Sequence, residues 1–197
     1  YKTIIYIPNI INAVAMSTMW ITAIFNKRFG FLHNFFALFN SDLATTDYMS
    51  GSIKFWSLLV AFCFGSVGYY MLIFMGGIER LSPDMYEAAT IDGASKIKQF
   101  TRITLPLLRG VFKTCLTFWS IGVVGFFVWS QMWSAPLASE LSTTTPFVYM
   151  YNITFGTQGT TFRNAAMGAA VGVLMAITVL IVFFLINLLV KEDDVEV

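Results

Sequence analysis

Long apolar runs alternate with shorter polar segments along the whole chain. Four runs are long enough to cross a bilayer, because a spanning helix needs about 20 mostly apolar residues. They cover about residues 4–25, 55–75, 107–129 and 165–190. None alternates like a membrane β-strand, and open strands would leave backbone groups unpaired in lipid. The pattern predicts an all-α fold, a polytopic bundle of about four transmembrane helices forming a single domain.

Composition also favours a membrane location. Of the 197 residues, 57% are hydrophobic and 12% are charged, and the mean hydropathy is +0.71. A soluble domain carries about 25% charged residues, so this chain has too few charges to cover a water-facing surface. The high hydrophobicity excludes a disordered chain. The net charge of +1, without a basic cluster, argues against nucleic acid as a partner.

Residue types that serve enzymes and metal sites are sparse. His33 is the only histidine, and Cys63 and Cys115 lie in apolar runs where we expect small core residues rather than disulfides. Metal-ligand spacings, a phosphate-binding GxxxxGK[ST] loop and a nucleophile–base set are absent from the sequence. The sequence therefore predicts a chain that is not an enzyme, binds no metal and holds no cofactor of its own.

Lys and Arg are unevenly divided between the two sides of the predicted bundle. One side holds eight: Lys2, Arg80, Lys96, Lys98, Arg102, Arg109, Lys113 and Lys191. The other side holds four: Lys27, Arg28, Lys54 and Arg163. Cytoplasmic loops carry the excess of these residues. The middle loop, residues 76–106, and the C-terminus are therefore predicted to be cytoplasmic.

Within that loop, the segment LSPDMYEAATIDGASKIKQFTRITLP predicts two short helices joined by a glycine turn. Ser82 is a suitable N-cap, and Pro83 fits the first helical position. Gly93 ends the first helix, and Ser95 can cap the second. Four apolar residues should give these helices something to bury: Ile91, Ile97, Phe100 and Ile103. The small Ala88 and Ala89 would let another surface approach closely.

The same loop resembles the signature loop of binding-protein-dependent ABC importer permeases. That signature reads EAA, three residues, Gly, nine residues, Ile, one residue and Leu-Pro. Every fixed position matches, and the flanking Asp and Ala are also typical: Glu87, Ala88, Ala89, Asp92, Gly93, Ala94, Ile103, Leu105 and Pro106. A lone EAA carries no information, whereas this spacing between two spans is highly specific.

Other segments are similar to the sugar-importer branch, and more narrowly to its larger, maltose-permease-like subunit. The first group of matching positions is Pro8, Trp20, Phe25, Asn26, Phe29, Gly30 and Asn34. The second group is Thr144 or Thr145, Tyr149, Tyr151, Phe155, Ala165, Gly168 and Ala169. The usual Gly-Gly-Pro is replaced by Ala135-Pro136. Such permeases have a six-helix core, so we expect the first helices to be missing here.

The resemblance implies a transport subunit of an ATP-driven importer that moves a sugar or related carbohydrate. The nine loop residues above would form a coupling helix that docks on a cytoplasmic ATPase subunit. ATP and Mg would be bound by that partner ATPase. Further implied partners are a second permease subunit in a heterodimer and an extracellular solute-binding protein. The location implied is the cytoplasmic membrane of a bacterium or archaeon.

Polar and aromatic residues inside the predicted spans are candidates for the solute path, because polar groups in a bilayer tend to face a cavity or another helix. They are Asn9, Asn12, Phe62, Ser66, Tyr69, Trp119 and Val123. Aromatic faces stack on sugars, and Asn or Ser pairs with hydroxyl groups. The competing interpretation is ordinary helix packing, where small and polar residues are also enriched.

Three alternatives stay open at this stage. The first is a permease of the same superfamily for an amino acid, a peptide or an anion. The second is a gradient-driven transporter or a channel, although no ionisable residue lies near the centre of a predicted span. The third is a membrane scaffold without a transport role. Dependence of uptake on ATP or on an ion gradient separates the importer from the second alternative.

Overall fold

The computed structural model describes residues 2–39, 42–134, 141–156 and 163–190. Regular structure within these ranges is helical throughout, which confirms the predicted all-α fold. The elements are α1 (Lys2–Ile10), α2 (Ala13–Met19), η1 (Trp20–Ile24), α3 (Phe31–Ala37), η2 (Asp42–Thr45), α4 (Gly51–Ile78), α5 (Pro83–Ile91), α6 (Lys96–Gln99), η3 (Phe100–Thr104), α7 (Leu105–Leu107), α8 (Arg109–Gly125), α9 (Phe127–Trp133), η4 (Leu141–Thr143), α10 (Pro146–Phe155) and α11 (Ala165–Leu189). η1 and η3 are π-helical, and η2 and η4 are short 3₁₀ helices.

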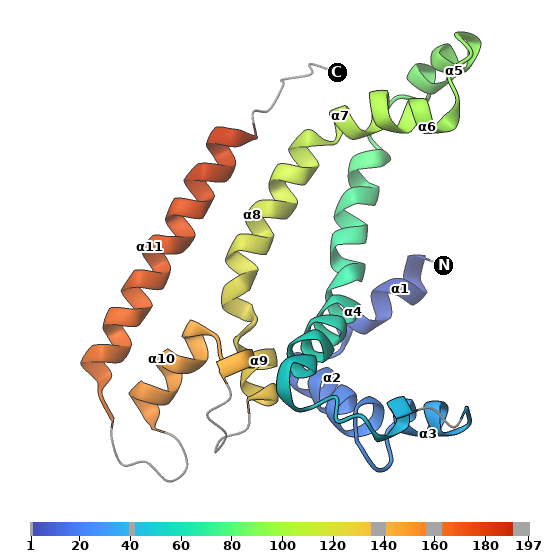
Figure 1. Ribbon diagram of the computed structural model, residues 1–197. Helices are drawn as coiled ribbons and strands as arrows, with labels where there is room; N and C mark the ends of the chain where they lie inside the picture. The colour runs from blue at the N-terminus through green and yellow to red at the C-terminus, as the bar shows by residue number, and fades with distance from the viewer. Residues whose placement is uncertain (1, 40–41, 135–140, 157–162, 191–197) are drawn as a thin grey trace. The chain divides into compact units, whose positions relative to one another are not determined.

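Two of these helices are long and apolar enough to cross a membrane by themselves. They are α4, with 28 residues, and α11, with 25 residues (Figure 1). Both coincide with charge-poor runs predicted from the sequence. Because α4 and α11 are apolar on nearly every side, the sequence does not show which side packs against protein. Cys63, expected in the core, is exposed on α4, whereas Cys115 is buried on α8.

The first predicted span is not one continuous helix. α1 and the α2–η1 helix meet at an angle of 100°. Asn12 adopts an extended conformation and its Oδ1 accepts a hydrogen bond from the Val14 N–H, at 2.8 Å, so it caps a new helix. Pro8 has no N–H to donate to the helix before it. The bend therefore follows from a proline and a cap that lie four residues apart.

The third predicted span is also not one continuous helix. The helix α8 ends at Gly125 and α9 begins at Phe127, so the run is divided into two helices. If each such pair of helices is one span, the described residues hold up to four spans by length and composition, the number that the sequence predicts.

The chain divides into two compact units, which are described separately. The first unit comprises residues 1–68 and 123–177, and the second comprises residues 69–122 and 178–197. In the first unit α2 packs on α9, around six buried residues: Met16, Phe25, Leu58, Ala61, Trp129 and Trp133. α1 crosses α4 so closely that a Cβ on Gly68 would lie 2.6 Å from the Ile5 carbonyl oxygen.

α10 packs on the start of α11, also within the first unit. A Cβ on Gly168 would overlap the Thr154 side chain, and one on Gly172 would lie 3.2 Å from the sulfur of Met150. Small residues at this spacing let two helices approach closely in a membrane. In the second unit, α4 packs against α8 through Phe74 and Phe112, whose ring centres are 4.8 Å apart.

Candidate functional site

The loop between α4 and α8 begins with a capped helix. Ser82 is extended, and its Oγ accepts a hydrogen bond from the Asp84 N–H at 3.3 Å. Pro83 occupies the first turn of α5, where its missing N–H costs nothing. Asp84 places a carboxylate at the positive end of the helix dipole. The predicted start of this helix is therefore confirmed.

The turn after α5 is a Schellman motif centred on Gly93. The Ala94 N–H donates to the Ala89 carbonyl at 2.9 Å, and the Gly93 N–H donates to the Thr90 carbonyl at 3.0 Å. Gly93 has φ of +73°, a conformation that other L-residues adopt only with strain. The Gly of the signature is thus required by the backbone geometry of the turn, as the sequence predicts.

Side-chain hydrogen bonds then hold α5 and the following segments together. The Gln99 Nε2 donates to the Thr90 hydroxyl at 3.0 Å and to the Ala94 carbonyl at 3.1 Å. The Tyr86 hydroxyl and the buried Thr104 hydroxyl lie 2.8 Å apart. Apart from Ala94, none of these residues was singled out from the sequence, because a polar residue in a short helix gives no signal of its partner. Together they make the loop one connected unit.

The loop returns to the membrane helices through a π-helical turn. The Leu105 N–H bonds to the Phe100 carbonyl, five residues earlier. Pro106 follows and cannot donate to the turn before it, which frees the backbone there from regular α-helical bonding. π-helical turns occur frequently at functional sites. The Leu-Pro end of the signature therefore coincides with the change from the loop to α8.

The surface of this loop exposes apolar side chains and one carboxylate. Ile91 is 87% exposed and Ile97 is 78% exposed, and Phe100 is also exposed, whereas Ile103 is half-buried. The expectation that the two short helices bury all four is therefore wrong within this chain. The helices are too short to cover them. Glu87 and Ala88 are exposed beside them, so we define Glu87, Ile91, Ile97 and Phe100 as the loop surface.

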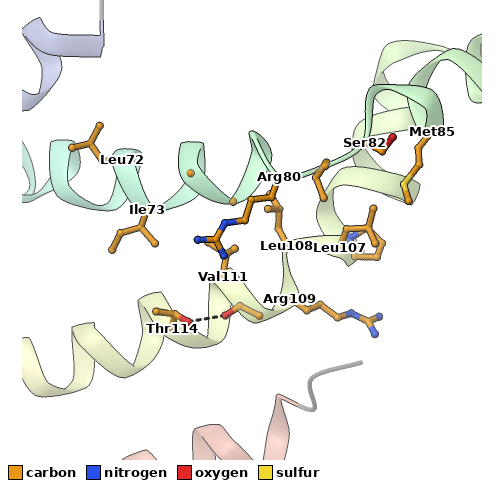
Figure 2. A pocket seen from close by; sticks show the side chains of 15 residues that line it. Leu72, Ile73, Arg80, Ser82, Met85, Leu107, Leu108, Arg109, Val111 and Thr114 are labelled. Carbon is orange, nitrogen blue, oxygen red and sulfur yellow. Dashed lines mark hydrogen bonds between the residues drawn. The ribbon is translucent and has the colours of Figure 1, made fainter. Parts of the chain in front are cut away.

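The base of the loop is anchored at a close helix contact. A Cβ on Gly77 of α4 would lie 2.5 Å from Val111 and 3.0 Å from Leu108. Next to this contact is a hollow of about 720 Å³, lined mainly by apolar side chains of α4, α5 and α8. In Figure 2 the Arg80 side chain reaches towards Val111, and Arg109 points away from it. The loop base thus combines one tight contact with one unfilled space.

Four of the seven path candidates have structural roles in the first unit. The Asn9 Nδ2 donates to the Gly65 carbonyl at 3.1 Å, and Asn12 caps α2. The Phe62 ring packs edge-on against Phe126, with ring centres 4.8 Å apart. The Ser66 hydroxyl donates to a carbonyl of its own helix at 2.8 Å. For these four residues the geometry favours the packing interpretation.

The remaining three candidates lie on α4 and α8, next to the positions at which the chain is divided into the two units. Tyr69 and Trp119 are exposed, and both belong to the second unit. The Tyr69 ring contacts Tyr70 and Phe118, with ring centres 5.3 and 6.4 Å apart. Val123 belongs to α8, but its side chain lies outside the described part of the structure. Ala135 and Pro136 also lie outside the described residues.

Four buried polar atoms in the first unit were missed by sequence reasoning. They have no hydrogen-bond partner among the described residues: Ser17 Oγ, Trp20 Nε1, Gln131 Oε1 and Trp133 Nε1. An unpaired buried polar group is costly, so each of these atoms is a place where water or another hydroxyl group would be stabilised. The sequence gives no signal for them, since whether a polar atom is buried without a partner depends on the residues that pack around it.

Comparison with known proteins identifies the kind of chain that carries this loop. The family model described as "Binding-protein-dependent transport system inner membrane component" matches residues 1–192. The diacetylchitobiose uptake system permease protein NgcF of Streptomyces coelicolor is 25% identical over 201 residues, which cover 100% of this chain and 55% of that protein. The arabinooligosaccharides transport system permease protein AraP of Bacillus subtilis is 33% identical over 117 residues, covering 59% and 36%.

A solved structure shows the same fold. It is the crystal structure of a bacterial ABC transporter involved in the import of the acidic polysaccharide alginate. The TM-score is 0.84 at 20% identity, and the match covers 98% of this chain and 65% of that chain. The chain spans about half the length of NgcF and less of AraP.

Proposed function

We propose that this chain, which belongs to the family of binding-protein-dependent transport system inner membrane components, forms part of the permease of an ATP-driven carbohydrate importer. The family match over residues 1–192 carries this proposal. Two relatives named above are permease proteins for chitobiose-type and arabinose-type oligosaccharides. A third, the MalF protein of Thermococcus litoralis, serves trehalose and maltose and is 25% identical over 127 residues, 64% of this chain and 42% of that protein.

The coupling role goes to the loop between α4 and α8. Under this proposal the loop surface docks in a groove of a cytoplasmic ATPase subunit, and burial of the exposed Ile91, Ile97 and Phe100 stabilises the contact. The Schellman turn and the Tyr86–Thr104 bond support this role because they make the loop rigid. A rigid element transmits a displacement that biases one of two conformations.

The displacement would reach the membrane through the base of the loop. Gly77 lets α4 and α8 touch closely, so a push on the loop is passed directly between these two helices. The neighbouring hollow of about 720 Å³ offers space into which side chains can shift during that movement. This is the shear type of motion, in which packed helices slide by small distances.

The assembly that we propose contains this chain, a second permease subunit, ATPase subunits that bind ATP and Mg, and an extracellular solute-binding protein. The loop and the C-terminus face the cytoplasm in this arrangement, as the excess of Lys and Arg on that side suggests. The chain itself would hydrolyse no ATP.

For the solute path, we retain Tyr69 and Trp119 as candidates, because no packing role accounts for their exposed side chains. Both are aromatic, exposed in this chain and carry no formal charge, which suits a neutral carbohydrate better than an ion. A permease for an amino acid, a peptide or an anion is the second candidate, because the family description names no particular solute.

The test is uptake by the purified full-length importer in liposomes. Radiolabelled di- and oligosaccharides would be offered with the binding protein outside and ATP inside. We expect uptake that requires ATP and is unchanged by a protonophore. Uptake that follows an ion gradient without ATP would overturn the importer assignment. ATP-driven uptake of amino acids or peptides alone would overturn only the carbohydrate assignment.

A further inference from the structure

The segment between the first bent pair and α4 carries an exposed aromatic face. It comprises α3 and the two residues after it, and the side chains of Phe31, Phe35, Leu38 and Phe39 are all exposed. Leu38 is the most exposed, at 81%. We call these four residues the aromatic ridge. Single exposed apolar residues are normal on a protein, but a contiguous group marks an interaction surface.

The ridge is continuous because its rings follow the helical repeat. The ring centres of Phe31 and Phe35 are 5.9 Å apart, and those of Phe35 and Phe39 are 5.4 Å apart. Residues four apart lie on the same side of a helix. The three rings and Leu38 therefore form one face, with no charged side chain among them.

The opposite side of α3 is attached to the protein. The His33 Nδ1 lies 2.7 Å from the carbonyl oxygen of the buried Ala44 in η2. A carbonyl only accepts, so this nitrogen carries the proton. Leu32 and Phe36 are half-buried on the same side. These contacts fix which way the ridge faces.

The turn into α3 is also fixed. The Asn26 Oδ1 accepts hydrogen bonds from the Arg28 and Phe29 N–H groups at 2.9 and 3.1 Å. Gly30 is buried against the Asn26 backbone, where a Cβ would not fit. The chain thus leaves η1 by a defined corner rather than by a loose loop.

The position of α3 in the first unit is close to the start of a membrane span. η2 and a short turn connect it to α4, and in Figure 1 α3 lies towards the end of α4 that holds its first residues. Phe55 and Trp56 are exposed on those first turns. Aromatic residues at the end of a span mark the level of the membrane–water interface. The ridge therefore lies within reach of that level.

We propose that the aromatic ridge is inserted in the bilayer interface at the beginning of α4, the end remote from the coupling loop. α3 is then an interfacial helix that holds the first bent pair and α4 at a fixed depth. Two exposed cations, Lys27 and Arg28, precede it and match the negative phosphates of lipid headgroups. Lys27 makes only a long, exposed pair with Asp47, at 4.0 Å, which does not compete strongly.

A lipid surface fits the ridge better than a protein partner does. An interfacial helix shows an apolar face of Phe and Leu beside basic residues, as here. The flanking membrane segments hold α3 at the interface whether or not another protein is bound. The His33 Nδ1 and the Asn34 Nδ2 are already engaged with carbonyl oxygens of the chain, so these two groups are not directed at a protein partner.

The test uses the full-length transporter in lipid nanodiscs with Cys63→Ser and Cys115→Ala. A single cysteine is introduced as Leu38→Cys or Phe39→Cys on the ridge, or as Thr45→Cys on exposed η2 as the matched control. Each is labelled with a small environment-sensitive fluorophore. Brominated phospholipid and aqueous iodide serve as the two quenchers.

We expect brominated lipid to quench the labels at 38 and 39, with a blue-shifted emission, and iodide to quench only the label at 45. The ridge labels should lie roughly 5–10 Å into the boundary between headgroups and acyl chains. Iodide quenching at 38 and 39 without lipid quenching would overturn the proposal. Labels at 38 and 39 that neither quencher reaches would also overturn it, because a protein would then cover the ridge. Equal lipid quenching at 45 would show that the ridge is not what inserts.

Discussion

The coupling loop and the first bent pair differ in how their shapes are determined. In the loop, Ser82 and Gly93 set the start and end of α5 through hydrogen bonds to residues within five positions in the sequence. In the bent pair, Asn9 binds the carbonyl of Gly65, 56 positions away, and Gly68 accommodates the backbone of Ile5. The course of α5 and its turn is thus set mainly by local chemistry, whereas the bent pair, beyond its local proline and cap, depends on packing against distant residues. A signature motif can therefore specify the first and not the second.

The largest effect is expected at the turn of the loop. Gly93→Val places a β-branched residue at φ of +73°, with strain of about 1–3 kcal/mol. We expect the full transporter to assemble in the membrane but to lose most ATP-driven uptake, because α5 and α6 would no longer keep their relative orientation. Uptake and ATP hydrolysis would be measured together in liposomes.

The matched control is Gly93→Asn, since Asn tolerates the left-handed conformation better than other residues do. It should retain most uptake. If the Val variant transports normally, local geometry at Gly93 does not carry the coupling.

The second effect concerns distant packing. Gly68→Ala brings a methyl group to 2.6 Å from the Ile5 carbonyl oxygen, and over-packing of this kind costs about 1–3 kcal/mol. The control on the same helix is Gly76→Ala, where nothing lies within 4 Å. Thermal unfolding in detergent should show a lower midpoint for the first variant only. Equal midpoints would mean that the α1–α4 contact does not contribute to stability.

A third effect, comparable to the second, tests the hydrogen bond that ties the loop together. Tyr86→Phe removes a partner of the buried Thr104 hydroxyl, at a cost of about 1–3 kcal/mol for the unpaired group. The double variant, which combines Tyr86→Phe with Thr104→Val, should cost less than the sum of the two single changes. A double-mutant cycle on ATP-driven uptake measures this, and strictly additive effects would contradict a direct bond.

The smallest effects separate packing residues from path residues. Asn12→Ala should lower the unfolding midpoint through the lost cap, worth about 1 kcal/mol, and leave the KM for uptake unchanged. Trp119→Ala should raise the KM and leave the midpoint unchanged, because its ring is exposed. The opposite pattern for the two variants would reverse their assignments.

The same contrast explains what the sequence could predict. The caps, the glycine turn and the Leu-Pro end of the loop were predictable because each depends on neighbouring residues. The bend after Ile10 was not predictable, because a polar Asn12 within an apolar run can equally indicate a helix cap or a residue that contacts solute. The burial of Lys54 and the exposure of Cys63 were not predictable either, because they depend on which side of α4 packs against the rest of the protein.

The apolar residues of the loop show a second limit of prediction from the sequence. Ile91, Ile97 and Phe100 were predicted to be buried, and the chain alone exposes them. Their apolar character was evident from the sequence, but the surface that would cover them belongs, in our proposal, to another subunit. The sequence thus indicated which side chains of the loop are apolar, but not which molecule would cover them.

The most direct test of the coupling role is a cross-link from the loop surface. Ile97→Cys would carry a short photoactivatable reagent in the full-length transporter without its native cysteines, with Thr45→Cys as the control site. We predict a cross-link from position 97, and not from position 45, to an ATPase subunit, with a yield that changes when ATP is added. An assembled transporter in which position 97 reaches no ATPase subunit, in any nucleotide state, would contradict the account.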